Sequence, residues 1–279
     1  MELLRDLKFQ QGFDIGHVDA LISRDPIGKW VFKPNSNPEW KICQWCTNHN
    51  LLEGKRIHLG NIASIENIAK KVEINHFTQT ISLEVFGQHE YLKPRLENEG
   101  WPHLLLEQFF INKYVKNFNY FTVNIDVSFD GFHDFMNDDR NNLHTCQFQW
   151  FFAIGKRNQI TNEVDDFFWF GIGLADYPRY DFVPPYQAID GGKEENTNKF
   201  IYIIDSKQYL NELLIPGSRV RVTYNAFDEM KQAYQLAQAR GYLRGVEFEE
   251  LEIISTNIGI EMTGTFQAKF TVRKINVEI

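Results

Sequence analysis

Apolar and polar residues alternate with a period of two along most of the chain. Residues 80–86 bring Ile81, Leu83 and Val85 to one side, and residues 120–129 alternate apolar with polar side chains throughout. The same pattern recurs over residues 144–154, 166–175, 199–205, 252–262 and 265–276. Successive side chains of a β-strand point to opposite faces, so this period predicts strands with one buried face.

One segment, residues 225–241, follows helical spacing instead. Its apolar residues recur at intervals of three or four positions from Phe227 to Ala237. Asn225 is a suitable N-cap and Gly241 a suitable C-terminal stop. We expect one amphipathic helix packed against the sheets.

The expected strands follow one another through turn signals, which favours antiparallel pairing. We therefore predict an all-β fold, an antiparallel β-sandwich of the jelly-roll type, with the helix packed on it. A chain of 279 residues without a linker, repeat or low-complexity tract fits one domain over residues 1–279. Prolines interrupt residues 1–60, which we expect to form a less regular outer layer. Long loops are expected at residues 130–142 and 177–197, and such loops often carry ligand contacts.

Composition supports a sheet protein. Aromatic residues make up 15% of the chain and fit pleated, half-buried surfaces. The net charge is −8 with no Lys/Arg-rich run, which argues against nucleic acid as a partner. No stretch of about 18 apolar residues occurs, so no membrane helix is predicted, and residues 1–10 lack the apolar core of a secretory signal. We expect a cytoplasmic protein without a membrane partner.

The sequence offers little for metal or cofactor chemistry. Its three cysteines do not suggest a disulfide framework. Cys43, Cys46 and His49 form at most half of a zinc site, and the acidic residues between 130 and 139 lack EF-hand spacing. Phosphate-binding loops, serine-hydrolase elbows and zinc-protease helices are not found. We predict no cofactor and no metal.

The informative positions are polar residues on strongly aromatic strands. His103 and Glu107 share one face of residues 101–110, and Gln147 and Gln149 share one face of residues 144–152. Trp169 stands beside two glycines in the sequence, which would leave space for a ligand against its indole.

Further polar positions extend this set. Asn257 and Glu261 share a face of residues 255–264, and Asp126 lies on the polar face of residues 120–129. If these strands pair in one sheet, its outer side combines carboxylates, amides and an aromatic ring. A glycan suits such a surface, because sugar CH faces pack on rings and hydroxyls bond to Asn, Gln, Asp and Glu. A sandwich also exposes polar side chains without any ligand, so the alternative is a non-catalytic structural or assembly protein.

Two catalytic interpretations use the same face. Glu107 and Glu261 have aromatic or glycine neighbours, surroundings that suit a general acid, and would act as acid/base and nucleophile or base. Their carboxyl groups would lie about 5–5.5 Å apart in a retaining glycosidase and about 6.5–9.5 Å apart in an inverting one. Alternatively, Arg179 with Tyr177 or Tyr180 would serve a polysaccharide lyase, in which Arg neutralises a uronate and Tyr exchanges a proton.

Four segments carry a family resemblance: WPHLLLEQ at residues 101–108, HTCQFQ at 144–149, FWFG at 168–171 and NIGIEMTG at 257–264. They resemble an uncharacterised bacterial family that is similar to concanavalin A-like or jelly-roll sandwiches, as in lectins, glucanases and polysaccharide lyases. The resemblance covers residues 100–279 and brings no activity with it. The acidic signature of laminarinase-like glucanases and the Gln-x-His pair of alginate-lyase-like sandwiches are absent.

Overall fold

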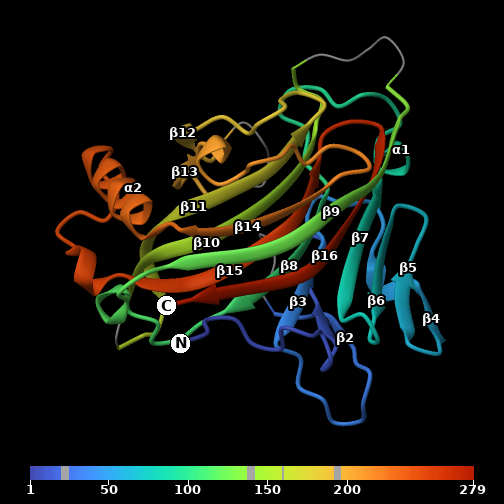
Figure 1. The fold of residues 1–279 in the computed structure, drawn as a ribbon, viewed down its shortest axis with the longest axis horizontal. Helices are drawn as coiled ribbons and strands as arrows, with labels where there is room; N and C mark the ends of the chain where they lie inside the picture. Colours follow the sequence, from blue (N-terminus) through green and yellow to red (C-terminus); the bar gives the residue numbers. More distant parts are fainter. Residues whose placement is uncertain (20–24, 137–141, 159, 192–195) are drawn as a thin grey trace.

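In a computed structural model, the chain forms two β-sheets packed face to face (Figure 1). The structure describes residues 1–19, 25–136, 142–158, 160–191 and 196–279. The nine-stranded sheet runs in the order β12 (Tyr186–Ile189), β13 (Phe200–Ile204), β11 (Val164–Tyr177), β10 (Cys146–Arg157), β15 (Glu252–Met262), β8 (His103–Phe109), β3 (Trp40–Cys43), β1 (Phe13–Ile15), β2 (Gly28–Trp30).

The seven-stranded sheet runs in the order β14 (Arg219–Asn225), β9 (Thr122–Asp134), β16 (Phe266–Glu278), β7 (Thr80–Phe86), β6 (Lys70–Asn75), β5 (Ile62–Glu66), β4 (Lys55–Leu59). Its strand pairs are all antiparallel, whereas β1 with β3 and β11 with β13 are parallel pairs in the larger sheet. The predicted antiparallel β-sandwich is confirmed.

The core lies between the two sheets and is built from the apolar side of the alternating strands. The rings of Phe148 on β10 and Phe270 on β16 stack across the interface with centroids 4.5 Å apart. Phe121 meets Phe152 edge to face at 5.0 Å. These residues are fully buried or nearly so. Because one face of β10 is committed to this core, its other face, with Gln147 and Gln149, points away from the sandwich interior.

The predicted helix is α2 (Phe227–Ala239), which packs against β11 and β13. Asn225 Oδ1 accepts a hydrogen bond from Phe227 N at 3.2 Å, although the residue in the cap position is Ala226. Gly241 follows the helix with a positive φ of 90°, the conformation that stops a helix at low cost in glycine. Short helical segments are α1 (Gly87–Glu90) and four 3-10 turns at Leu51–Glu53, Val115–Asn117, Ser206–Gln208 and Phe248–Glu250.

Residues 1–60 extend the two sheets at their edges instead of forming a layer over them. Strand β3 pairs with β8, and β1 and β2 continue the nine-stranded sheet beyond it. The expected loop at residues 130–142 begins later, because β9 continues to Asp134, and residues 137–141 lie outside the described part. The expected loop at residues 177–197 contains β12.

A buried ion pair joins β6 to α1. Lys70 Nζ lies 2.9 Å from Glu90 Oε1, and both side chains are fully buried. Thr47 bonds to both partners, Asn48 N donates to Glu90 Oε2 at 2.9 Å, and Lys70 Nζ donates to the His49 carbonyl at 2.8 Å. Burial lowers the pKa of Lys70, and the Glu90 carboxylate opposes this effect.

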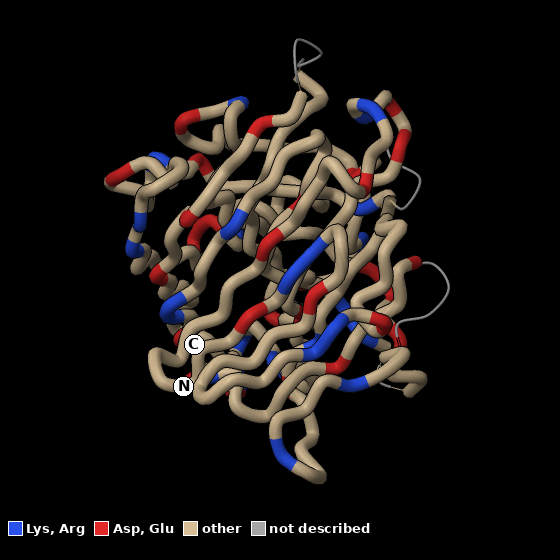
Figure 2. Tube along the Cα trace, turned by 90° about the vertical axis from the view of Figure 1, so that its right-hand side faces the viewer, with Lys and Arg blue, Asp and Glu red and all other residues tan. Residues whose placement is uncertain are grey.

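The two ends of the chain lie side by side (Figure 1). The amino group of Met1 donates to the carbonyl of Ile279 at 2.8 Å, and Leu3 N donates to Val277 O at 2.9 Å. Acidic and basic positions are interspersed over the side of the molecule shown in Figure 2. Among the described residues, none of the helices has the length and apolar character needed to cross a membrane.

Candidate functional site

A groove of about 750 Å³ lies on the outer face of the nine-stranded sheet. Its floor is the non-core side of β8, β15, β10 and β11. Other lining residues come from the β1–β3 region (Gly16, His17 and Lys41) and from the segment after β11 (Tyr180, Val183 and Pro184). Nearly all the site residues predicted from the sequence line it: His103, Glu107, Gln147, Gln149, Trp169, Arg179, Tyr180, Asn257 and Glu261. The exception is Asp126.

Cross-strand register arranges four polar side chains in a line, which we call the polar row. His103 lies opposite Glu261, Glu261 opposite Gln147, and Gln147 opposite Asp176. His103 Nε2 is 3.4 Å from Glu261 Oε2, and Gln147 Nε2 donates to Asp176 Oδ2 at 3.1 Å. The row thus crosses four neighbouring strands, from β8 to β11.

Asp176 is held at its end of the polar row by several donors. Arg179 binds it through Nη2 and through Nε at 3.2 Å, and the Thr145 hydroxyl donates to Oδ1. The Arg179 guanidinium also lies 5.0 Å from the Tyr180 ring centroid. Its charge is therefore already paired with a carboxylate within the protein.

A β-bulge in β11 places Asp176 on the groove side of the sheet. Gln149 pairs with Gly173 but Phe148 pairs with Ala175, so Leu174 is an extra residue in β11. Strict alternation from Gly173 would put Ala175 on the groove side and Asp176 in the core. The bulge reverses this assignment and completes the polar row.

Two buried polar atoms at the groove have no hydrogen-bond partner among the described residues: His103 Nδ1 and Gln149 Oε1. His103 is 4% exposed and Gln149 is 3% exposed. Gln149 occupies the next groove-facing position after Gln147 on β10. A buried polar atom without a partner costs the folded protein about 1–3 kcal/mol.

Glu107 lies in a second polar group, with Lys41 and Cys43. Lys41 Nζ is 2.6 Å from Glu107 Oε2, and the Cys43 thiol donates to the same oxygen at 3.2 Å. Burial raises the pKa of the Cys43 thiol, and the Glu107 carboxylate raises it further. Cys43 is therefore a protonated thiol at neutral pH and not a nucleophile.

The register places Glu107 and Glu261, the expected catalytic pair, at different levels of the sheet. Glu107 lies opposite Asn257, four residues before Glu261 on β15. Four residues of extended strand correspond to about 13 Å between Cα atoms. The two glutamates bind different partners, Lys41 and His103.

The other end of the groove is apolar. Ala153, Phe167 and Ile254 form a cluster separate from the main core, with Val164 and Trp169 packed against it, and we call these five residues the apolar cluster. Ile254 reaches the groove because a second register irregularity, between Ala153 and Ile154 of β10, makes it an extra residue in β15.

Trp169 is half-buried, and two ring contacts and one hydrogen bond hold its indole in place. Its ring meets those of Phe167 at 5.2 Å and Phe151 at 6.2 Å, and its Nε1 donates to Thr197 Oγ1 at 3.0 Å. The space expected above Gly171 and Gly173 is filled. A Cβ on Gly171 would lie 2.5 Å from Phe151, and one on Gly173 would lie 2.5 Å from Val183. The indole therefore meets the groove beside these side chains and not over open glycines.

Asp126 is the predicted site residue that the structure places elsewhere. It lies on β9 of the seven-stranded sheet, where Arg219 and Arg221 bind its carboxylate at 2.6 and 3.0 Å. Hydrogen bonds from Arg219 lower the pKa of Asp126. Alternation assigned Asp126 to the polar side of its strand correctly, but that side belongs to the opposite sheet.

The groove also includes residues that the sequence did not single out. Lys41, Trp45 and Trp101 line it from segments with irregular patterning. Tyr177, unlike Tyr180, packs against the core, where its ring centroid lies 5.7 Å from that of Phe129. The alternating pattern at residues 166–175 ends one residue before Asp176. Only the register of the whole sheet shows that these residues meet.

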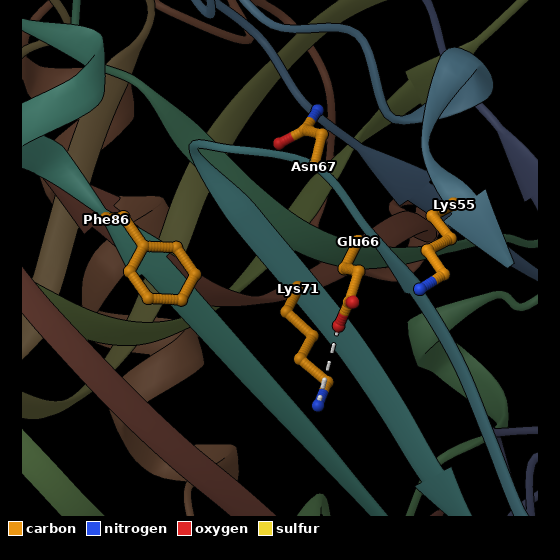
Figure 3. A pocket seen from close by; sticks show the side chains of 5 residues that line it. All are labelled: Lys55, Glu66, Asn67, Lys71 and Phe86. Atoms are coloured by element: carbon orange, nitrogen blue, oxygen red, sulfur yellow. Dashed lines mark ion pairs between the residues drawn. The ribbon is translucent and has the colours of Figure 1, made fainter. Parts of the chain in front are cut away.

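A second, smaller pocket of about 410 Å³ lies beside β4–β7 (Figure 3). Its lining residues are Lys55, Glu66, Asn67, Lys71 and Phe86. Lys71 is paired with Glu66 at 3.6 Å and with Glu73 at 2.8 Å. None of its lining atoms is among the buried polar atoms without a partner in the described residues. In the part of the chain that the structure describes, no cluster of three His, Cys, Asp or Glu side chains is arranged to hold a metal.

No protein-family profile and no curated protein sequence matches the chain. Solved structures with a similar arrangement include a family 12 xyloglucanase from Bacillus licheniformis, with 13% identity, a TM-score of 0.41 and coverage of 80% of this chain and 96% of that one. Endoglucanase cel12A from Rhodothermus marinus has 11% identity, a TM-score of 0.39 and coverage of 81% and 97%. A loop-swap mutant of Necallimastix patriciarum Xyn11A has 7% identity, a TM-score of 0.42 and coverage of 83% and 96%. Similarity at this level assigns no activity to the chain.

Proposed function

We propose that the protein binds a glycan in the groove of the nine-stranded sheet. The observation that carries this proposal is the combination, in one groove, of the polar row and a half-buried indole. Sugars need both features, because their hydroxyls exchange hydrogen bonds with carboxylates and amides while their CH faces pack on aromatic rings.

The charges in the groove favour a neutral glycan over a uronate. Lys41 is paired with Glu107, Arg179 with Asp176, and Lys199 Nζ with Asp166 at 2.6 Å. A uronate carboxylate would have to compete with these carboxylates for its cation. The lyase alternative, which needs Arg179 to neutralise the substrate, therefore has less support than binding of a neutral sugar.

Recognition does not require hydrolysis, and Glu107 and Glu261 are bound to different partners, Lys41 and His103. In this proposal Glu261, Gln147 and Asn257 contact sugar hydroxyls, and His103 positions Glu261. Glu107 orders the Lys41 side of the groove through its ion pair. Release of reducing ends from a bound oligosaccharide would show that groups of the groove supply an acid and a base.

The test measures binding of a panel of neutral oligosaccharides by isothermal titration calorimetry. We expect Trp169→Ala to raise the dissociation constant of an oligosaccharide that binds at least about tenfold, because loss of ring stacking worth about 1.4 kcal/mol has that effect. Phe77→Ala is the matched control, since Phe77 is 79% exposed and lies outside the groove. If no member of the panel binds the unaltered protein, the glycan proposal is wrong and an assembly role is favoured.

A further inference from the structure

Polarity changes from one end of the groove to the other. The polar row crosses the sheet at Glu261, and the apolar cluster surrounds Ser255, six residues earlier on the same strand. Six residues of strand span about 20 Å. A ligand that fills the groove therefore meets two chemically different surfaces.

Several polar groups near the apolar cluster are bonded to one another. The Trp169 indole donates to Thr197, the Thr197 hydroxyl donates to Asp190 at 2.6 Å, and Lys199 binds Asp166. These bonds leave ring and aliphatic surface toward the groove at this end. At its rim, Phe109 and Ile189 are 37% and 58% exposed, and both line the groove.

The opposite end has the reverse character. Here the polar row presents a carboxylate, an amide and an imidazole to the groove. Sugar hydroxyls both donate and accept, so they can bond to all three kinds of group. An apolar group placed here would remove water from these groups without bonding to them and would lose affinity.

We propose that the ligand is amphipathic: a neutral oligosaccharide head that extends from the polar row toward Trp169 and carries an apolar alkyl or aryl substituent over the rest of the apolar cluster. This inference rests on the proposed glycan function and adds the chemical class of the ligand. The last sugar unit packs on the exposed side of Trp169, the substituent covers Ile254 and Phe167, and the rim residues Phe109 and Ile189 flank it.

The experiment titrates the protein with methyl, butyl, hexyl and octyl β-cellotriosides, whose three sugar units bridge the distance from the polar row to the apolar cluster, all below their micelle-forming concentrations. Burial of each methylene group is expected to lower the dissociation constant about fourfold until the apolar end is filled. Ile254→Thr places a hydroxyl in the apolar cluster and should flatten the dependence on chain length. Ile68→Thr, at an exposed site outside the groove, is the matched control and should keep the full dependence.

The possible outcomes separate this inference from the function on which it rests. If neutral oligosaccharides or methyl cellotrioside bind but longer alkyl chains add nothing, the amphipathic ligand is excluded and glycan binding stands. If 1-octanol binds as tightly as octyl cellotrioside, the sugar contributes nothing and both proposals are wrong. If neither the cellotriosides nor the oligosaccharide panel bind, the glycan function and this inference are both wrong.

Discussion

Gln149 is an unusual residue because its amide oxygen is buried without a partner among the described residues. A group of this kind destabilises the protein by about 1–3 kcal/mol. The Gln149 side chain also lines the groove. We predict that Gln149→Met, which removes the polar group at similar volume, raises the free energy of unfolding by about 1 kcal/mol and weakens glycan binding. Denaturant unfolding and calorimetric titration of the same variant measure the two effects. A variant that loses stability and keeps its affinity would show that Gln149 has a structural role.

Asp126 gives a prediction about acid stability. Arg219 holds the pKa of this carboxyl below its ordinary value, so its stabilising contribution is present above the unfolded-state pKa of about 3.9 and is lost as the pH falls through the folded-state pKa. We expect Asp126→Asn to lower the unfolding free energy at pH 7 by at most about 1 kcal/mol, since the arginines are partly exposed. The difference from the unaltered protein should disappear toward pH 2. In the Arg219→Gln/Arg221→Gln background the same substitution should have no pH-dependent effect.

At the scale of elements, the Lys70–Glu90 pair joins β6, α1 and the turn at residues 47–49. Removing one member leaves a buried charge without its counter-ion, which costs about 3–5 kcal/mol, whereas replacing both with apolar residues is often close to neutral. We predict that Lys70→Met strongly lowers the midpoint of urea unfolding and that adding Glu90→Leu restores most of it. Equal loss in the single and double variants would mean that packing, not the ion pair, sets the stability here.

The sequence predicts the bounds of strands and helices well, but it misses the β-bulges within them. Alternation located β7 and β15 with their observed bounds, and helical spacing located α2 to within two residues at each end. Alternation could not locate the bulges at Leu174 and Ile254, because an extra residue breaks the period without leaving a composition signal. Those two irregularities place Asp176 and Ile254 in the groove, so local pattern alone could not give the ends of the site.

At the scale of the whole molecule, alternation shows which side of its own strand a residue occupies but not which sheet the strand joins. Asp126 illustrates this limit, since its strand β9 lies between β14 and β16 in the smaller sheet. The convergence of Glu261, Gln147 and His103 depends on β15 inserting between β8 and β10, a pairing across more than 100 residues of sequence. Long-range pairing of this kind follows from the fit of complete faces, which no single segment encodes.

The adjacent ends of the chain lead to a prediction for the molecule as a whole. A circular permutant that joins Ile279 to Met1 through a short Gly-Ser linker and begins at Asn61 should fold, because the new ends fall in the exposed turn between β4 and β5. Its far-UV circular dichroism and its glycan dissociation constant should match those of the original chain. A permutant that folds but loses the ligand would indicate that β4 and β5 influence the groove from a distance.

The groove and the core use opposite faces of the same four strands, so recognition and folding draw on different side chains. A combinatorial library varied at Gln147, Gln149 and Asn257, with Phe148 and Trp150 kept, should therefore yield new specificities on an unchanged scaffold. Gly259 has to stay constant in such a library. Its φ is 154°, and an added Cβ would lie 2.2 Å from the backbone oxygen of Leu104.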